Sequence, residues 1–236
     1  MPHTTRPEQS PRHPLHVTSR VRAGLPNLRE ARTQRLLVDT LRAGCDRFGF
    51  RLIEYSVQTN HFHLVVEVPD RTALTRGAKG LFVRLAKQLN KRWGRKGNVF
   101  PDRFHARALE TPRAVRNALV YVLHNARKHR CWGSGVDPFS SGPWFEGYRD
   151  RAAQRASAGS CRSAGSAGAA GPAPPRSWIV STVFPDGSEW VISGLADDTR
   201  MQGWPRPVRR ARSWLLAVGW RRFGAIGLDE APASAA

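Results

Sequence analysis

The sequence of 236 residues is short of cysteine, of acidic side chains and of long apolar runs. Its three cysteines, Cys45, Cys131 and Cys161, are widely spaced and odd in number. This excludes a disulfide scaffold or a CxxC zinc site and fits a reducing cytoplasm. No stretch approaches the roughly 18–20 apolar residues of a membrane span, and residues 1–14 are too polar for a secretory signal. We therefore expect a cytoplasmic, nucleoid-associated protein that has no membrane partner.

Two chemical signatures are also missing from the sequence. It contains no GxxxxGK[ST] loop, which excludes the common phosphate cradle of ATP- and GTP-hydrolysing enzymes. The eight acidic residues between 16 and 130 are scattered and form no apparent DDE-type set of metal-binding carboxylates. Any chemistry on a polyanion therefore has to come from other residue types.

The scarcity of acidic residues gives the chain a large positive charge. It carries 38 Lys and Arg against 18 Asp and Glu, a net charge of +20, and residues 16–130 alone carry +16. A solubility role combined with codon bias is the alternative explanation, and it accounts for the preference for Arg over Lys. It does not account for the small number of acidic residues, so we expect a nucleic-acid partner.

The composition changes after about residue 131, and we divide the chain into three parts. Residues 12–131 form the first domain, residues 132–176 connect it to the rest, and residues 177–236 form a small C-terminal extension. In 151–176, 20 of 26 residues are Ala, Gly, Ser or Pro, which predicts a disordered linker. Strands at 177–183 and 189–193 are predicted around a 185–187 turn, and a short amphipathic piece at 211–219. The extension is either an accessory module or a segment that packs back on the first domain.

The first domain has an alternating order of predicted strands and helices. Apolar spacing and turn residues give β-α-β-β-α-β-α, with Thr111 as N-cap and Pro112 as first residue of the last helix. This order predicts an α+β fold, a ferredoxin-like antiparallel sheet with helices on one face. The elements lie at residues 16–21, 28–48, 51–58, 61–67, 71–93, 103–110 and 111–129.

One strand carries two histidines in the pattern His61-Phe62-His63. Side chains alternate along a strand, so both imidazoles share a face and could bind one metal ion. An isolated HxH is more often a pair of surface histidines. On the last helix, Tyr121 and Asn125 lie four residues apart on one face, turned away from the apolar stripe. A lone tyrosine at such a position is commonly part of the core edge, yet this one is free to react.

Three separated motifs together resemble the HUH single-tyrosine transposases, most closely the REP-associated branch of bacteria. They are residues 60–63 (NHFH), 99–105 (VFPDRFH) and 121–127 (YVLHNAR). The resemblance covers roughly residues 12–131. It implies the HUH transposase fold and an enzyme that binds hairpin single-stranded DNA and cleaves it with a divalent metal, Mg²⁺ or Mn²⁺.

The resemblance also implies a role for individual residues. His61 and His63 match the metal-binding pair, Tyr121 matches the nucleophile, and Asn125 matches the position of a third polar metal ligand in some members. The product would be a 5′-phosphotyrosine and a free 3′-OH, with no need for ATP. Ala126 replaces the proline that usually follows the asparagine, so the motif departs from the family there. The sequence leaves open whether the protein is a monomer or a homodimer that shares its tyrosine helix.

Basic side chains on two elements are predicted to bind DNA. One set follows the second helix and its end, and the other alternates on the next strand, as phosphate tracking requires. A solvated helix face is an equally good explanation for the first set. The predicted DNA-binding residues are Arg84, Lys87, Lys91, Arg95, Lys96, Arg103, His105 and Arg107.

Two other functions remain possible for this pattern. A catalytically silent, domesticated DNA-binding protein would keep the fold and charge, although it would not require His61, His63 and Tyr121 together. A metallohydrolase or RNA-binding module with a coincidental HxH is the third reading. A covalent protein–DNA adduct that depends on Tyr121 would favour the transposase over both of these alternatives.

Overall fold

The computed structural model describes residues 9–129, 131–132, 135–149, 178–183, 189–194 and 204–232. The chain divides into two compact units. The first consists of residues 1–149 together with 205–236, and the second of residues 150–204. The predicted linker from 151 and the 185–187 turn lie outside the described residues.

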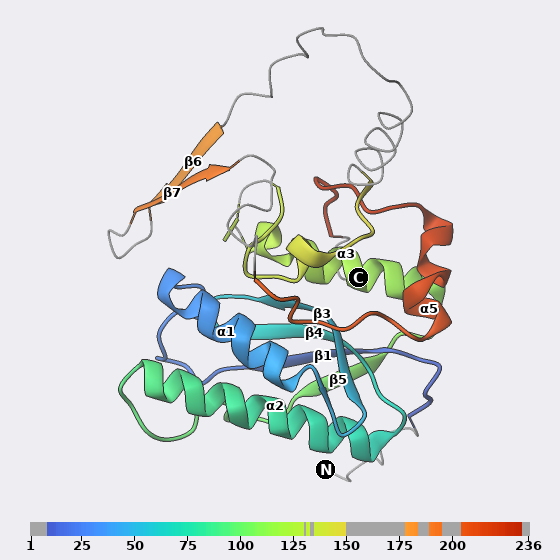
Figure 1. The fold of residues 1–236 in the computed structure, drawn as a ribbon, viewed down its shortest axis with the longest axis horizontal. Helices are drawn as coiled ribbons and strands as arrows, with labels where there is room; N and C mark the ends of the chain where they lie inside the picture. The colour runs from blue at the N-terminus through green and yellow to red at the C-terminus, as the bar shows by residue number, and fades with distance from the viewer. Residues whose placement is uncertain are drawn as a thin grey trace, which may run out of the picture. The chain divides into compact units, whose positions relative to one another are not determined.

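A five-stranded antiparallel sheet forms the centre of the first unit, in the order β2-β3-β4-β1-β5 (Figure 1). Its long central strands are β3 and β4, joined by a tight connection at Thr59 and Asn60, where the Gln58 amide donates to the His61 carbonyl at 2.8 Å. The strands are β1 (Leu15–Arg20), β2 (Asp46–Arg47), β3 (Phe50–Val57), β4 (His61–Glu67) and β5 (His105–Ala108).

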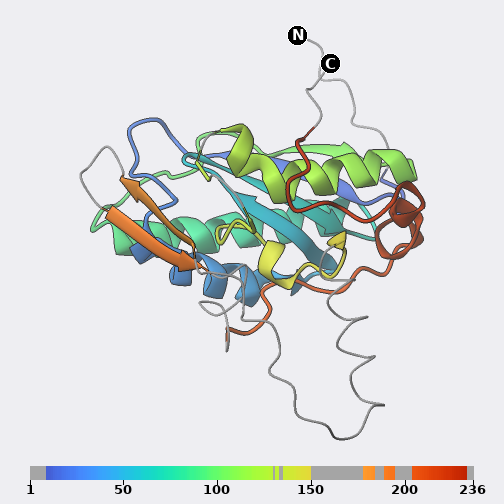
Figure 2. The same cartoon turned by 90° about the horizontal axis from the view of Figure 1, so that it is seen from above.

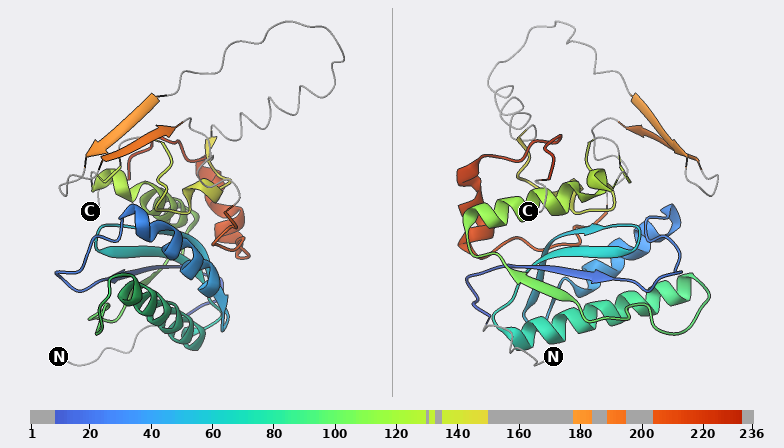
Figure 3. Two further views of the ribbon diagram at one scale, coloured as in Figure 1. Left: turned by 60° about the vertical axis from the view of Figure 1, so that its left-hand side comes forward. Right: turned by 180° about the vertical axis from the view of Figure 1, so that it is seen from behind.

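Helices cover both faces of the sheet (Figures 1 and 3). α1 (Ala31–Gly44) and α2 (Arg71–Arg92) pack on the face of Phe62, Leu64 and Val66. α3 (Pro112–Lys128) packs on the opposite face, over Ile53 and Val65. The α+β class and the antiparallel sheet are confirmed, but the expectation that all helices lie on one face is wrong. The central strands are buried on both faces, so each face has its own cover.

Local sequence explains where the helices begin. The Asp70 side chain accepts the Ala73 amide hydrogen at 2.7 Å and caps α2. The predicted start of α3 is confirmed, because Thr111 accepts from Ala114 at 3.1 Å and Pro112 follows at the first helical position. α1 is shorter than the predicted 28–48, since the chain turns into β2 after Cys45 and Phe48 has a positive φ of 56°.

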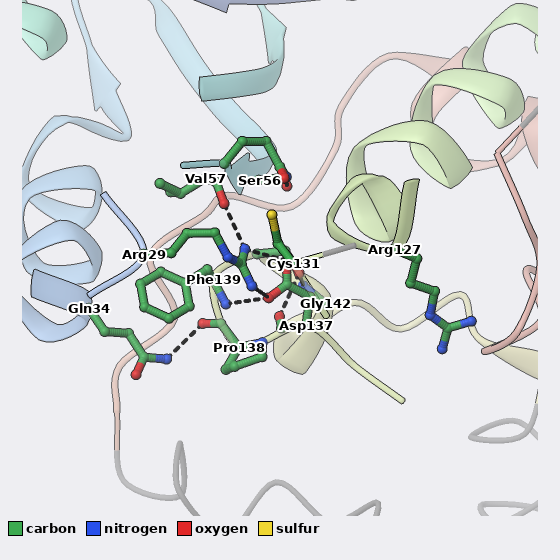
Figure 4. A network of polar contacts seen from close by, with 12 residues as sticks. Arg29, Gln34, Ser56, Val57, Arg127, Cys131, Asp137, Pro138, Phe139 and Gly142 are labelled. Atoms are coloured by element: carbon green, nitrogen blue, oxygen red, sulfur yellow. Dashed lines mark hydrogen bonds and ion pairs between the residues drawn. The ribbon is translucent and has the colours of Figure 1, made fainter. Parts of the chain in front are cut away.

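A buried ion pair holds the segment around Asp137 at the C-terminal end of β3. Arg29 donates to both carboxylate oxygens of Asp137 at 3.0 and 2.8 Å and to the Val57 carbonyl at 2.7 Å (Figure 4). The two side chains are 4% and 3% exposed, so removing either one would leave the charge of the other buried and unpaired. A backbone hydrogen bond joins the same segment to β3, since the Val57 amide donates to the Phe139 carbonyl at 2.8 Å.

Residues 205–232, called the C-terminal segment below, return to the first unit and pack on α3. Leu215, Leu216 and Trp220, in α5 (Trp214–Ala217) and the 3₁₀-helix η3 (Gly219–Phe223), join the same apolar cluster as α3. Figure 2 shows α5 and η3 beside α3, whereas Val208, near the start of the segment, belongs to the apolar cluster of α1 and α2. The extension was predicted to be either an accessory module or a segment that packs back on the first domain, and residues 205–232 pack back on the first unit. α3 therefore packs against both the sheet and this segment.

Buried polar contacts anchor the start of the C-terminal segment. The Glu67 carboxylate at the end of β4 accepts the backbone N–H groups of Arg212 and Ser213 at 2.7–3.0 Å. The Arg209 amide donates to the Leu52 carbonyl at 2.7 Å. A carboxylate that accepts several backbone N–H groups can be buried at low cost, so Glu67 forms a fixed attachment point.

The described residues of the second unit form two antiparallel paired strands, β6 (Trp178–Val183) and β7 (Glu189–Gly194), close to the predicted strands. A short 3₁₀-helix, η1 (Gly142–Trp144), belongs to the first unit. Among the described residues no helix is both long and apolar enough to cross a membrane.

Candidate active site

The antiparallel register brings polar side chains of four strands onto the sheet face that α3 covers. His63 of β4 is paired with Thr18 of β1 and Ser56 of β3, and Thr18 is paired in turn with His105 of β5. Residues opposite each other in an antiparallel pair point to the same face, so these four form one row. The next row contains His16 and Arg107, and Arg20 is paired with His61.

His61 and His63 lie side by side on this face. Their ring centroids are 4.8 Å apart, and the rings are nearly perpendicular at 86°. His61 is partly exposed and donates from Nδ1 to the Asn60 side-chain oxygen at 2.8 Å, which leaves its Nε2 free to act as a ligand. His63 is 5% exposed, and its Nε2 is buried without a hydrogen-bond partner among the described residues.

Tyr121 projects from α3 toward the same histidines. Its ring centroid is 5.1 Å from that of His63, edge to face at 87°, and 5.8 Å from that of His16. Lys128, two turns further along α3, has its ammonium 5.2 Å from the centre of the Tyr121 ring. The nucleophile candidate and the histidine pair, 58 residues apart in sequence, therefore meet because α3 lies on the histidine face.

Asn125 occupies the turn of α3 between two residues that contact the pair. Tyr121 precedes it by four residues and contacts His63, and His129 follows it by four and lies 5.5 Å from His61 between ring centroids. Asn125 is fully buried, and neither atom of its side-chain amide has a partner within the described part of the chain. A buried amide without partners is costly, so this group is suited to a ligand that the structure does not contain.

Burial keeps the histidines of the site neutral. Desolvation, with the charges of His129 and Arg20, lowers the pKa of His61 to about 4. Desolvation, aided first by the charge of His16, lowers the pKa of His63 to about 2. Desolvation and the neighbouring Arg107 lower the pKa of His16 to about 4. At neutral pH all three rings are therefore uncharged, which is the state that can bind a metal.

His61 and His63 could provide two ligands for a divalent metal, and the amide oxygen of Asn125 could provide a third. Within the described ranges no group of three or more His, Cys, Asp or Glu side chains could hold a metal ion. Two neutral imidazoles remain, one of them with a buried Nε2 that has no partner among the described residues, and the amide of Asn125, one helical turn after Tyr121, likewise has none there. The residues present are therefore compatible with a metal whose other ligands come from water or substrate.

The predicted DNA-binding residues divide between the two sides of the sheet. His105 and Arg107 are exposed on the same face as the histidine pair. The residues of α2 and its end lie in the layer on the other side, where Lys87, Lys91 and Lys96 are exposed. Arg84 and Arg95 there are partly buried and donate to the Ala43 carbonyl and the Asn90 side chain.

Arg103 lines a groove next to α2, and Arg107 lines the same groove. The groove has a volume of about 1560 Å³ and includes the aromatic side chains Phe82, Phe100 and Phe104 as well as Lys79. None of His61, His63 and Tyr121 lines it. The structure therefore brings together Tyr121, His61, His63, His105 and Arg107, and leaves Arg103 and the α2 residues elsewhere.

Four residues of this site escaped the sequence reasoning: His16, Thr18, Lys128 and His129. The last two could have been found, because spacings of seven and eight residues return to the face of Tyr121 on a helix. For His16 and Thr18 the only signal was their alternation within the first strand, at residues 15–20. That pattern does not say which strand lies beside them.

Comparison with known proteins gives one family match. Residues 15–124 match the family described as "Transposase IS200 like", a range that includes His61, His63 and Tyr121 and ends one residue before Asn125. This confirms the resemblance stated from the motifs. Searching the curated proteins gives no match. Among solved structures, the chain is similar to a REP-associated tyrosine transposase bound to a REP hairpin, with 18% identity and a TM-score of 0.45. The alignment covers 60% of this chain and 82% of that one.

Proposed function

Because residues 15–124 match the IS200-like transposase family, we propose that the chain is a metal-dependent transposase that cuts and rejoins single-stranded DNA. Tyr121 would be the nucleophile. The observation that carries the proposal is the contact of the Tyr121 ring with His63, at 5.1 Å between centroids. A silent DNA-binding protein needs no such approach of a phenol to an uncharged imidazole whose Nε2 has no partner among the described residues.

The reaction uses the phenol oxygen of Tyr121 and one phosphodiester. As the Oη–P bond forms, the bond from phosphorus to O3′ breaks, and the proton lost by the phenol and the proton gained by O3′ pass through solvent. The products are a 5′-phosphotyrosine and a free 3′-OH. Because the phosphotyrosine keeps the energy of the broken bond, attack by a 3′-OH can reverse the step without ATP.

Three side chains would hold the divalent metal, Mg²⁺ or Mn²⁺: His61 and His63 through ring nitrogens and Asn125 through its amide oxygen. When bound, the metal would withdraw charge from a non-bridging phosphate oxygen and so favour attack by an anionic nucleophile. Lys128, with its ammonium close to the Tyr121 ring, is suited to contact a phosphate that approaches the phenol.

The open half of the sheet face supplies a path for the substrate strand. α3 covers β3 and β4, whereas Arg20, His105 and Arg107 on β1 and β5 are exposed. The charges of Arg107 and Arg20 act on His16 and His61, and a phosphate backbone has to pass these histidines to reach the phenol. The hairpin form of the substrate is supported by the resemblance of the three motifs to the single-tyrosine transposases.

The experiment is a covalent-adduct assay with labelled single strands that contain a hairpin and unpaired flanks, in Mn²⁺ and in Mg²⁺. We expect wild-type protein to form an adduct that resists denaturing electrophoresis, and Tyr121→Phe to form none. The matched control is Tyr55→Phe, because the Tyr55 hydroxyl is buried without a partner among the described residues and lies outside the site.

Two results would count against the proposal. An adduct that persists in Tyr121→Phe would show that another residue is the nucleophile. Tight binding of hairpin strands by wild-type protein with no adduct in either metal would favour the silent DNA-binding protein.

A further inference from the structure

Two side chains of β1 converge on a single nitrogen of His63. His16 Nε2 lies 3.1 Å from His63 Nδ1, and Thr18 Oγ1 lies 3.2 Å from the same atom. Both distances are those of hydrogen bonds. The pairing of β1 with β4 fixes the arrangement, since Thr18 is directly opposite His63 in the register.

The surroundings of Nε2, the other ring nitrogen of His63, determine which nitrogen carries the ring hydrogen. A neutral imidazole has one N–H and one lone pair. A hydrogen on Nε2 would be buried without an acceptor among the described residues, because that atom has no partner there. A hydrogen on Nδ1, in contrast, can be donated to His16 Nε2 or Thr18 Oγ1. Because an unmade buried hydrogen bond costs about 1–3 kcal/mol, the Nδ1–H form is favoured.

We propose that His16, together with Thr18, is a positioning residue that holds His63 in its Nδ1–H form and thereby leaves the Nε2 lone pair for the metal. The inference rests on the proposed function, since the metal is part of that function. It assigns His16 a task outside the metal ligands themselves: it accepts from His63 through Nε2 and carries its own hydrogen on Nδ1.

His16 also contacts the rings of His63 and Tyr121, so it can orient the His63 ring as well as accept its hydrogen. The His16 and His63 rings are stacked, with centroids 5.2 Å apart and planes 26° apart, and the edge of Tyr121 meets His16 at 5.8 Å. His16, His63 and Tyr121 therefore form a triangle in which each ring touches the other two. A change at His16 should alter the direction of the His63 ring as well as its hydrogen, whereas a change at Thr18 should affect the hydrogen alone.

The first experiment reads the hydrogen position directly in metal-free protein. Long-range ¹H–¹⁵N correlation spectra of full-length, histidine-labelled protein distinguish a protonated Nδ1 from a protonated Nε2, with His63→Gln used to assign the signals. We expect His63 to be Nδ1–H in the wild type and a mixture of both forms in His16→Ala. A wild-type His63 that is Nε2–H would overturn the proposal without any variant at His16.

The second experiment measures Mn²⁺ affinity by electron paramagnetic resonance, which detects the unbound ion and needs no DNA. Loss of a partner of a ligating histidine typically weakens metal binding about 10–100-fold, so we expect that range for His16→Ala. His16→Gln keeps an acceptor and should restore most of the affinity. His13→Ala, which removes a histidine just before β1, is the control and should bind Mn²⁺ like the wild type.

The outcomes separate this inference from the proposed function. If wild-type protein binds no Mn²⁺ and His61→Ala changes nothing, the proposed function fails. If Mn²⁺ binding depends on His61 but is the same in His16→Ala as in the wild type, only the positioning role fails. An equal loss in His16→Gln and His16→Ala would also contradict the role, because the acceptor would then not matter.

Discussion

Arg116 and Glu230 form a two-pronged ion pair, with Nη1–Oε1 and Nη2–Oε2 distances of 2.6 and 2.8 Å. The pair joins the helix of Tyr121 to a residue 114 positions later in the chain. His124, also on α3, donates from Nδ1 to the Glu230 carbonyl at 2.7 Å. The outer side of the tyrosine helix is thus attached to the C-terminal segment at one residue through both its side chain and its backbone.

Glu230→Gln should lower the free energy of unfolding by about 1 kcal/mol, the value of a charged hydrogen bond at a partly exposed site. The hydrogen bond from Arg116 lowers the pKa of Glu230 below its ordinary 4.5. The stabilisation is therefore present above pH 4.5 and lost as the pH falls through the lowered pKa. Urea unfolding at pH 7 and pH 3 measures both values.

Asp229→Asn is the matched control for this variant, because Asp229 is 87% exposed although it also faces an arginine of α3, Arg127, at 3.1 Å. Its effect should stay within about 0.5 kcal/mol. Equal losses for the two variants would mean that the C-terminal segment is not held through Glu230.

Glu54 should make the protein less stable as the pH rises. Its burial raises its pKa from 4.5 to about 8. The folded form therefore keeps a proton that the unfolded chain gives up above pH 4.5, so the free energy of unfolding falls between pH 4.5 and 8, by at most about 1.4 kcal/mol per pH unit. Ser141 Oγ, which accepts from the Tyr55 amide at 2.9 Å, donates to the Glu54 carboxyl and limits this rise in pKa without cancelling it.

Urea unfolding from pH 6.5 to 8.5 measures this slope in the wild type and in Glu54→Gln, which cannot ionise. Both proteins carry the same histidines, so the titration of unfolded histidines cancels in the difference between their slopes. We expect the slope to be smaller in Glu54→Gln. Parallel profiles for the two proteins would show that Glu54 is already ionised in the folded state.

Arg107→Ala should weaken binding of an unpaired strand several-fold and reduce the slope of log affinity against log salt by about 1, because one phosphate contact is lost. The matched control is Lys91→Ala, because Lys91 is an exposed cation of α2, the helix on the opposite side of the sheet. We expect the smaller effect from Lys91→Ala in fluorescence anisotropy at several salt concentrations. A larger effect from Lys91→Ala would place the strand along α2 instead.

Asn125→Leu should separate stability from metal binding. Leucine has nearly the same size and removes two buried polar atoms that have no partner among the described residues, so the metal-free protein should gain about 1 kcal/mol. Mn²⁺ affinity should fall, since the amide oxygen is gone. A destabilised variant with wild-type Mn²⁺ affinity would assign Asn125 a purely structural role.

Local patterns in the sequence accounted for much of the fold and part of the site. The cap at Thr111, the apolar stripe of α3 and the shared face of His61 and His63 each depend on neighbours within a few residues. The side of the sheet that α3 covers was not predicted, because periodicity tells which side of a helix is apolar and not which surface it meets. The contacts of His16 with His63 and of Arg116 with Glu230 escaped prediction for the same reason, since they join residues 47 and 114 positions apart.

The first unit is continuous in space but interrupted in sequence. Residues 150–204 leave it after Arg149 and return at Pro205. The Arg149 amide donates to the Ile226 carbonyl at 2.9 Å, so the end of the first piece is fastened to the second. Residues 150–204 therefore stand in the sequence between the two pieces of the first unit. A chain cut after residue 149 would lose the outer cover of the tyrosine helix, whereas a chain in which a short linker replaces residues 150–204 would keep every side chain of the unit.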